Sequence, residues 1–178
     1  MDTRSHLIET AFKLFLDKGY SSTSMANLVE SSKLSKGAVY HHFENKEKLY
    51  IEVIDKYFLF YFKQVDLDAM KDMNLTEMNI ILKDFFSSFI PKTIKITPKG
   101  VSRHFILFFE AFEIHPTFKE YVRNFYAELR KVLETGFKKN KSKNPENDAI
   151  ILISKYEGLL FWQSVFPEQN IEQILLEI

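Results

Sequence analysis

The chain has 178 residues, and its composition, 46% hydrophobic and 27% charged, favours a folded protein and argues against disorder. Its 24 basic residues balance 24 acidic ones, so the overall charge does not by itself indicate a nucleic-acid partner. Because cysteine is absent, disulfides and thiolate metal sites are excluded.

Apolar residues that recur at helical spacing predict two helices at the start of the chain, and a third follows them. An apolar stripe from Leu7 to Phe15 stops at Gly19, and glycine is a common helix terminator. Thr23 or Ser24 can cap the second helix, because a side-chain oxygen at that position accepts from the first backbone N–H groups. The local pattern therefore predicts two helices joined by a short loop.

A third, very short helix is predicted over about residues 36–42, with Ser35 as its cap. Such a short helix is marginal in water, so its neighbours must hold it. Together with a helix at about 24–31 it forms a helix-turn-helix, whose second helix can enter the major groove. Its outward side chains are expected to be Lys36, Tyr40 and His41, with Ala38 and Val39 packed inward.

The rest of the chain also shows helical periodicity and no strand-like alternation. Asn45 can cap a long fourth helix that continues to Val65, and Pro91 is expected to end the fifth. We therefore predict an all-α protein with a three-helix helix-turn-helix domain over 1–45 and a second helical domain over 46–178. The later elements are expected at about 76–90, 101–114, 117–138, 148–166 and 172–178, with a connector at 91–100.

Three residues in and near the third helix lower helix stability but favour the binding of an anion. Gly37 costs about 1 kcal/mol relative to alanine in a helix, but it would let a ligand approach the backbone closely. Lys46 and Lys48 lie in the first turn of the fourth helix, where the helix dipole is already positive. A phosphate group would reverse that penalty, so these positions favour a nucleic-acid backbone.

Each of these features also has a plainer explanation. Gly37 would also suit tight packing against a neighbouring helix, and the two lysines would also suit a solvated helix end. The adjacent His41 and His42 could suggest a metal pair, but neighbouring residues point to different faces of a helix and no third ligand lies at a useful spacing. We therefore predict no metal and no cofactor.

The stretch "GYSSTSMANLVESSKLSKGAVYHHFENKEKL" resembles the DNA-binding signature of the TetR family of bacterial transcriptional regulators. The resemblance covers about the first 50 residues and implies a homodimer that represses from a palindromic operator until a small molecule binds its C-terminal domain. The family often has glycine where this chain has Lys33, which leaves the positive-φ residue of the turn open. By position, the resemblance and the helix-end pattern give as DNA-binding residues Thr23, Ser24, Lys33, Ser35, Lys36, Gly37, Tyr40, His41, His42, Lys46 and Lys48.

The stretch "HFILFFEAFEIH" places several phenylalanines on one helical stripe. Most of these rings are expected to be core, but large rings leave gaps, and a gap among helices would admit a hydrophobic effector. A carboxylate beside aromatic faces suits a lipophilic cation, although a solvent-facing or ion-paired state is the preferred expectation for Glu113. The predicted pocket residues are Phe86, Phe89, Phe105, Phe108, Phe109, Phe112, Glu113, Phe125 and Trp162.

The helix at 148–166 is apolar nearly all round, which is more than one core can cover, and Gly158 permits close approach of another backbone. With the helix at 117–138 it would form a four-helix interface across a twofold axis. The alternative is that both helices merely complete the monomer core. The predicted interface residues are Phe118, Tyr121, Val122, Phe125, Leu129, Gly158 and Phe161.

The best-supported function is therefore a DNA-binding repressor, and the alternative is a helical ligand-binding or scaffold protein without operator binding. An enzyme is not predicted, since the sequence has no HExxH, nucleophile elbow or phosphate loop. No apolar run approaches 18 residues without a charge, and the N-terminal stretch is unlike a secretory signal. We accordingly expect a cytoplasmic protein with no membrane partner.

Overall fold

The computed structural model describes residues 2–94, 101–169 and 173–174, and over these residues the chain is helical, with no strand. The prediction of an all-α fold is confirmed. The helices are α1 (Thr3–Lys18), α2 (Met25–Ser32), α3 (Lys36–His42), α4 (Lys46–Ile54), the π-helix η1 (Asp55–Leu59), α5 (Phe60–Phe62), α6 (Leu67–Met70), α7 (Leu75–Ile94), α8 (Val101–Ile114), α9 (Pro116–Lys139) and α10 (Pro145–Val165).

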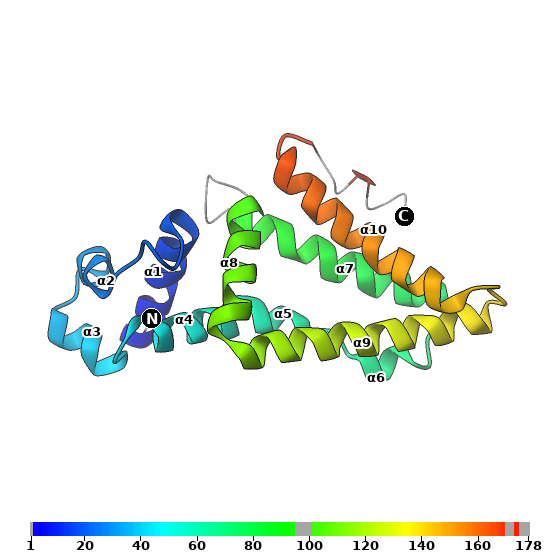
Figure 1. Cartoon of the computed structure of the whole chain (residues 1–178), viewed down its shortest axis with the longest axis horizontal. Helices are drawn as coiled ribbons and strands as arrows, with labels where there is room; N and C mark the ends of the chain where they lie inside the picture. The colour runs from blue at the N-terminus through cyan, green and yellow to red at the C-terminus, as the bar shows by residue number, and fades with distance from the viewer. Residues whose placement is uncertain (1, 95–100, 170–172, 175–178) are drawn as a thin grey trace.

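The helices α1–α3 lie at one end of an elongated molecule, and α7, α9 and α10 extend toward the other end (Figure 1). α8 stands between the two groups, and it packs against α1 and α4 on one side and against α7, α9 and α10 on the other. α8 is therefore the element that joins the two ends of the fold.

The N-terminal helices begin where their capping residues predict. The Ser24 hydroxyl accepts from the backbone N–H of Asn27, whose side chain accepts in return from the Ser24 N–H. Ser35 accepts from the N–H of Ala38 in the same way. Val39 is fully buried and anchors α3 to the core, which explains how a seven-residue helix is held in place.

The predicted fourth helix is confirmed only in part, because it is neither uniform nor as long as expected. Helical backbone begins at Lys46, but the turn Asp55–Leu59 is π-helical, and the helix ends at Phe62 rather than at Val65. A π-helical turn holds an extra residue, which rotates the next turn about the helix axis. Both Phe58 and Phe62 are buried. The apolar residues that suggested one straight helix therefore belong to two segments, which the π-helical turn rotates relative to each other.

The prediction that Pro91 ends the fifth helix is wrong, because α7 continues through that residue to Ile94. A proline inside a helix removes one backbone hydrogen bond without requiring the helix to stop. The connector expected at 91–100 is thus helical in its first part, and residues 95–100 lie outside the described ranges. The short helix expected at 172–178 also lies almost entirely outside them.

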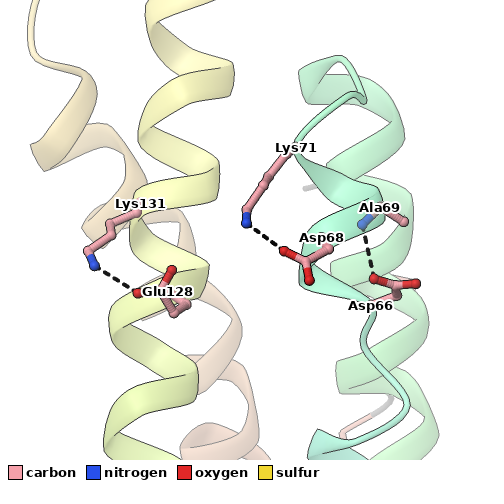
Figure 2. A network of polar contacts seen from close by, with 6 residues as sticks. All are labelled: Asp66, Asp68, Ala69, Lys71, Glu128 and Lys131. Atoms are coloured by element: carbon pink, nitrogen blue, oxygen red, sulfur yellow. Dashed lines mark hydrogen bonds and ion pairs between the residues drawn. The ribbon is translucent and has the colours of Figure 1, made fainter.

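The short helix α6 lies beside α9, and polar side chains make local contacts within each of the two helices (Figure 2). Asp66 caps α6 by accepting from the N–H of Ala69 at 2.9 Å, and Lys71 pairs with Asp68 at 2.5 Å. On α9, Lys131 pairs with Glu128 at 2.7 Å. Each of these exposed ion pairs contributes little to the stability of the fold, which depends on the buried core instead.

Tyr50 makes a buried contact between α4 and α8. Its hydroxyl donates to the backbone carbonyl of Leu107 at 2.8 Å, and burial raises the pKa of Tyr50 far above its usual range, so the hydroxyl remains protonated. We expect Tyr50→Phe to lower the free energy of unfolding by about 1–2 kcal/mol in urea denaturation. Tyr40→Phe, at an exposed position, should change the same quantity by less than about 0.5 kcal/mol. Equal effects would contradict the role of this hydrogen bond.

Candidate nucleic-acid interface and internal cavity

The outer surface of α3 and the turn before it carry exposed polar and cationic side chains. Lys36, Tyr40 and His41 are exposed, as predicted, and Lys33 and Ser35 are exposed beside them. The Lys36 ammonium lies 5.8 Å from the centre of the Tyr40 ring, which is within range of a cation–π contact. Within the described residues, neither Lys33 nor Lys36 forms an ion pair, so both can take an external anion.

Lys33 itself takes the left-handed conformation of the turn, with φ 60° and ψ 22°. A side chain is tolerated there at some cost, whereas glycine carries no penalty. Lys33 is thus the positive-φ residue of the turn, and the chain passes from α2 to α3 without a glycine. The lysine also places an exposed ammonium group at the start of the α3 surface.

Gly37 leaves open space on the surface of α3. A Cβ placed there would meet only the Ser35 hydroxyl oxygen, at 4.0 Å. The alternative that this glycine serves tight packing against a neighbouring helix is therefore wrong. Its backbone is accessible from outside, as an approaching phosphate would require.

Five other predicted DNA-binding residues are partly or wholly engaged within the chain. Thr23 is buried, and its hydroxyl donates to the carbonyl of Gly19 at 2.8 Å. Lys46 is half-buried, and its ammonium donates to the carbonyl of Tyr20 at 2.9 Å. Lys48 pairs with Glu44 at the exposed helix end, and His42 is half-buried. Ser24 is exposed, although its hydroxyl donates to Asn27.

The Lys46 position has a structural explanation that the sequence did not suggest. Its ammonium lies 4.1 Å from the centre of the Tyr20 ring as well as against the Tyr20 carbonyl. Lys46 therefore ties the start of α4 to the loop after α1. These contacts with Tyr20 offset the cost of placing a lysine at the positive end of the helix dipole. An anion is not needed to explain this lysine.

A cavity of about 350 Å³ lies among α5, α7, α8, α9 and α10, a size typical of small-molecule sites. Phe109 belongs to its lining and is 58% exposed. The predicted residues that line it are Phe86, Phe105, Phe108, Phe109 and Phe112. Further lining residues that were not predicted for the pocket are Phe62, Phe85, His104, Val122, Tyr126, Ile153, Glu157 and Leu160.

Several predicted pocket residues lie elsewhere. Glu113 is exposed on α8, Phe125 is buried in the core, and Trp162 is 44% exposed with its indole N–H donating to Gln169. None of these three lines the cavity. The reason is rotational, since Glu113 follows Phe112 on the helix and points to a different side. The side chain of Phe89 lies outside the described residues.

The polar groups of the cavity are Glu157, Tyr126 and His104. The Tyr126 hydroxyl donates to the Glu157 carboxylate, and burial raises the pKa of both groups. Burial lowers the pKa of His104 to about 3, so its imidazole is neutral at physiological pH. Glu157 is an acid inside a helix that is otherwise mostly apolar, and that pattern was the signal for it in the sequence.

α8 connects the cavity to the N-terminal helices. His104 and Phe108 line the cavity, whereas Arg103 donates from its Nε to the carbonyl of Leu16 at 2.7 Å. The Glu110 carboxylate accepts from the backbone N–H of Tyr20 at 3.2 Å. These two hydrogen bonds tie α8 to the end of α1 and to the loop between α1 and α2.

The predicted dimer-interface residues divide into two sets. Phe118, Val122, Phe125 and Leu129 of α9 are buried within this chain, whereas Tyr121 is half-buried. On α10, Gly158 is exposed with open space around it and Phe161 is 64% exposed. Amphipathicity correctly indicated that α9 has an apolar face, but α7, α8 and α10 of the same chain cover it.

The described residues hold no group of three or more histidine, aspartate or glutamate side chains that could bind a metal ion. Among the described helices, none is long and apolar enough to cross a membrane.

Comparison with known proteins gives the family of the N-terminal part. Residues 7–53 match the family model for bacterial regulatory proteins of the tetR family. The HTH-type transcriptional regulator YuxN of Bacillus subtilis is 46% identical over 52 residues, which are 29% of this chain and only 18% of YuxN. Full-length activities of such relatives therefore do not transfer directly.

Two further comparisons extend over the whole chain. The HTH-type transcriptional regulator YhgD of Bacillus subtilis is 27% identical over 183 aligned residues, which cover 100% of this chain and 94% of YhgD. The solved structure of a transcriptional regulator from Aquifex aeolicus VF5 is 21% identical and has a TM-score of 0.72, with 99% of this chain and 95% of that chain covered. The N-terminal helices of this chain therefore match the tetR family of bacterial regulatory proteins over residues 7–53, and the fold of the whole chain is similar to that of a solved transcriptional regulator.

Proposed function

We propose that this protein is a transcriptional repressor that binds a palindromic operator as a homodimer and leaves it when a small hydrophobic effector enters the cavity. Residues 1–45 would form the DNA-binding domain and residues 46–178 the effector-binding and dimerisation domain. The observation that carries the proposal is the outer surface of α3, where exposed Lys33, Lys36 and Tyr40 surround the open backbone at Gly37. We infer no enzymatic activity.

The α3 surface is chemically suited to a DNA backbone and to base edges. Ammonium and hydroxyl groups bind phosphate oxygens, and lysine can also reach the acceptors of a guanine in the major groove. Lys33, Ser35, Lys36, Tyr40 and His41 are the contacts that we propose from exposure. Ser24 and Lys48 would add contacts at the edges, whereas Thr23 and Lys46 would act by holding the fold.

A helix of seven residues reads only a few base pairs, so useful specificity needs two copies about 34–36 Å apart on successive major grooves. We propose that α10 supplies the twofold contact through its exposed apolar stripe. Ile151, Gly158, Phe161 and Val165 recur at intervals of seven, three and four residues, which is the spacing of a helix–helix seam. This replaces the buried α9 residues as the centre of the interface.

Release of DNA would depend on the position of α8. An effector that binds more tightly to one arrangement of α8 shifts the protein toward that arrangement, typically by about 1–3 kcal/mol of coupling free energy. Through Arg103, Glu110 and the Tyr50 hydroxyl, such a shift would move the N-terminal helices and α4. The spacing of the two α3 helices would then no longer match the operator.

The proposal is tested with a duplex that the protein selects from a random DNA pool. Affinity should fall steeply with salt, with a slope of about −5 to −9 in a log–log plot if the dimer makes roughly six to ten phosphate contacts. The selected sequence should be a palindrome. Failure to select any sequence, or a slope near zero, would instead support a helical ligand-binding or scaffold protein without operator binding.

A further inference from the structure

Glu157 is an acidic group within an aromatic cavity. It projects from α10 into the lining and accepts a hydrogen bond from the Tyr126 hydroxyl of α9. Around it the lining consists mainly of phenylalanine rings from α5, α7 and α8. An ionised carboxylate in such surroundings is costly unless a positive charge or several donors accompany it.

Among the residues that the structure describes, the cavity lining supplies no positive charge to accompany Glu157. None of the described residues that line the cavity is a lysine or an arginine, and His104 is neutral at physiological pH because it is buried. The Tyr126 hydroxyl provides one hydrogen bond but no charge. The cavity therefore carries an acid without a base, and a ligand can contribute the missing cation.

The aromatic rings of the lining also favour a cationic ligand over an anionic one. The face of a phenylalanine ring is electron-rich, so it attracts a cation and repels an anion. Phe85, Phe108 and Phe112 are in contact with other rings of the same cluster, and an ammonium group next to Glu157 would meet several ring faces together. An anionic ligand would be opposed by both the carboxylate and the rings.

We propose that the cavity binds lipophilic cations of the amine or quaternary ammonium class, with the cationic nitrogen beside Glu157 and the apolar part among the phenylalanine rings. This inference rests on the proposed function only in treating the cavity as the effector site. Glu157 takes the place of Glu113 as the carboxylate that determines the charge of the ligand.

The competing possibility is that Glu157 stays protonated and donates to a neutral ligand, since burial raises its pKa. The two forms respond oppositely to pH. A cation stabilises the carboxylate, so its affinity weakens as pH falls through the pKa of Glu157, whereas a neutral acceptor binds better at low pH. The other titratable groups that line the cavity are His104 on α8 and Tyr126 on α9.

Three probes that share a phenylbutyl group separate these possibilities: (4-phenylbutyl)trimethylammonium, 4-phenylbutan-1-ol and 4-phenylbutanoate. Binding to the free full-length protein is measured by titration calorimetry. We expect the cation to bind at least tenfold more tightly than the alcohol, and the anion to show no saturable binding. Glu157→Gln should reduce the affinity for the cation by about tenfold to a hundredfold and leave that for the alcohol nearly unchanged.

Two further variants keep the test decisive. Glu113→Gln is the matched control, because Glu113 is an exposed carboxylate on α8 that does not line the cavity, and it should leave all affinities unchanged. Tyr126→Phe retains the carboxylate and should preserve the preference for the cation, even if Glu157→Gln fails to fold. Equal binding of cation and alcohol, or no binding of the cation, would overturn the inference.

Failure of this inference is distinguishable from failure of the proposed function. Probe binding is measured without DNA, and operator binding is measured without a probe. Selection of a palindromic duplex together with a preference for the alcohol would keep the repressor and reject the cationic ligand. Tight binding of the cation without selection of DNA would keep the cationic ligand and reject the repressor.

Discussion

Replacing both Lys33 and Lys36 with glutamate is expected to lower the affinity for the selected operator by about a thousandfold or more at physiological salt. Each change removes a cation from the α3 surface and adds an anion that faces the DNA phosphates. A homodimer carries four such changes. Because both side chains are exposed and form no ion pair within the described residues, the folded protein should be little affected.

The mechanism can be separated from general charge repulsion by two measurements. The glutamine variants of the same lysines should reduce the slope of log affinity against log salt by about 3 to 4, if all four lysines of the dimer contact phosphates. Reversal of Lys131 and Lys138 on α9 changes the net charge equally, at a distance from α3. In Figure 2, Lys131 is seen paired with Glu128. Equal losses in both double variants would reject the α3 surface as the DNA contact.

Features set by neighbouring residues along the chain were predictable from the sequence. Ser24, Ser35 and Asn45 begin their helices as predicted, because a capping hydrogen bond involves only residues two or three positions apart. The bounds of α8 were also predicted, since Pro116 and the apolar spacing define them locally. Local chemistry of this kind needs no knowledge of the tertiary structure.

Features that depend on contacts between distant elements were not predictable. Lys46 was expected to face DNA, but it meets the carbonyl of Tyr20, a residue 26 positions earlier in the chain. Amphipathicity showed that Leu129 faces an apolar neighbour without showing whether that neighbour belongs to the same chain. Glu157 was missed although it is an acid within an apolar stretch of α10, because that pattern does not show which cavity the side chain enters.

Phe161→Glu is expected to weaken self-association by about a thousandfold and to leave a folded monomer in sedimentation equilibrium. Burial of one phenylalanine side chain contributes about 2 kcal/mol, and the twofold axis doubles this to about 4 kcal/mol. The introduced carboxylates would also oppose each other across the seam. Because Phe161 is 64% exposed within one chain, the substitution should change the stability of the monomer very little.

The matched control is Phe60→Glu, which alters a phenylalanine of similar exposure, 52%, on α5 instead of α10. It should leave the dimer intact, because Phe60 is not part of the α10 stripe. The monomeric Phe161 variant should also lose operator affinity, although it retains every side chain of α3, because one short helix cannot supply the contacts of two. If the Phe161→Glu protein remains dimeric at the same concentration, the twofold contact lies away from α10. If it is monomeric but binds the operator as tightly as the unchanged protein, one copy is enough to read the DNA.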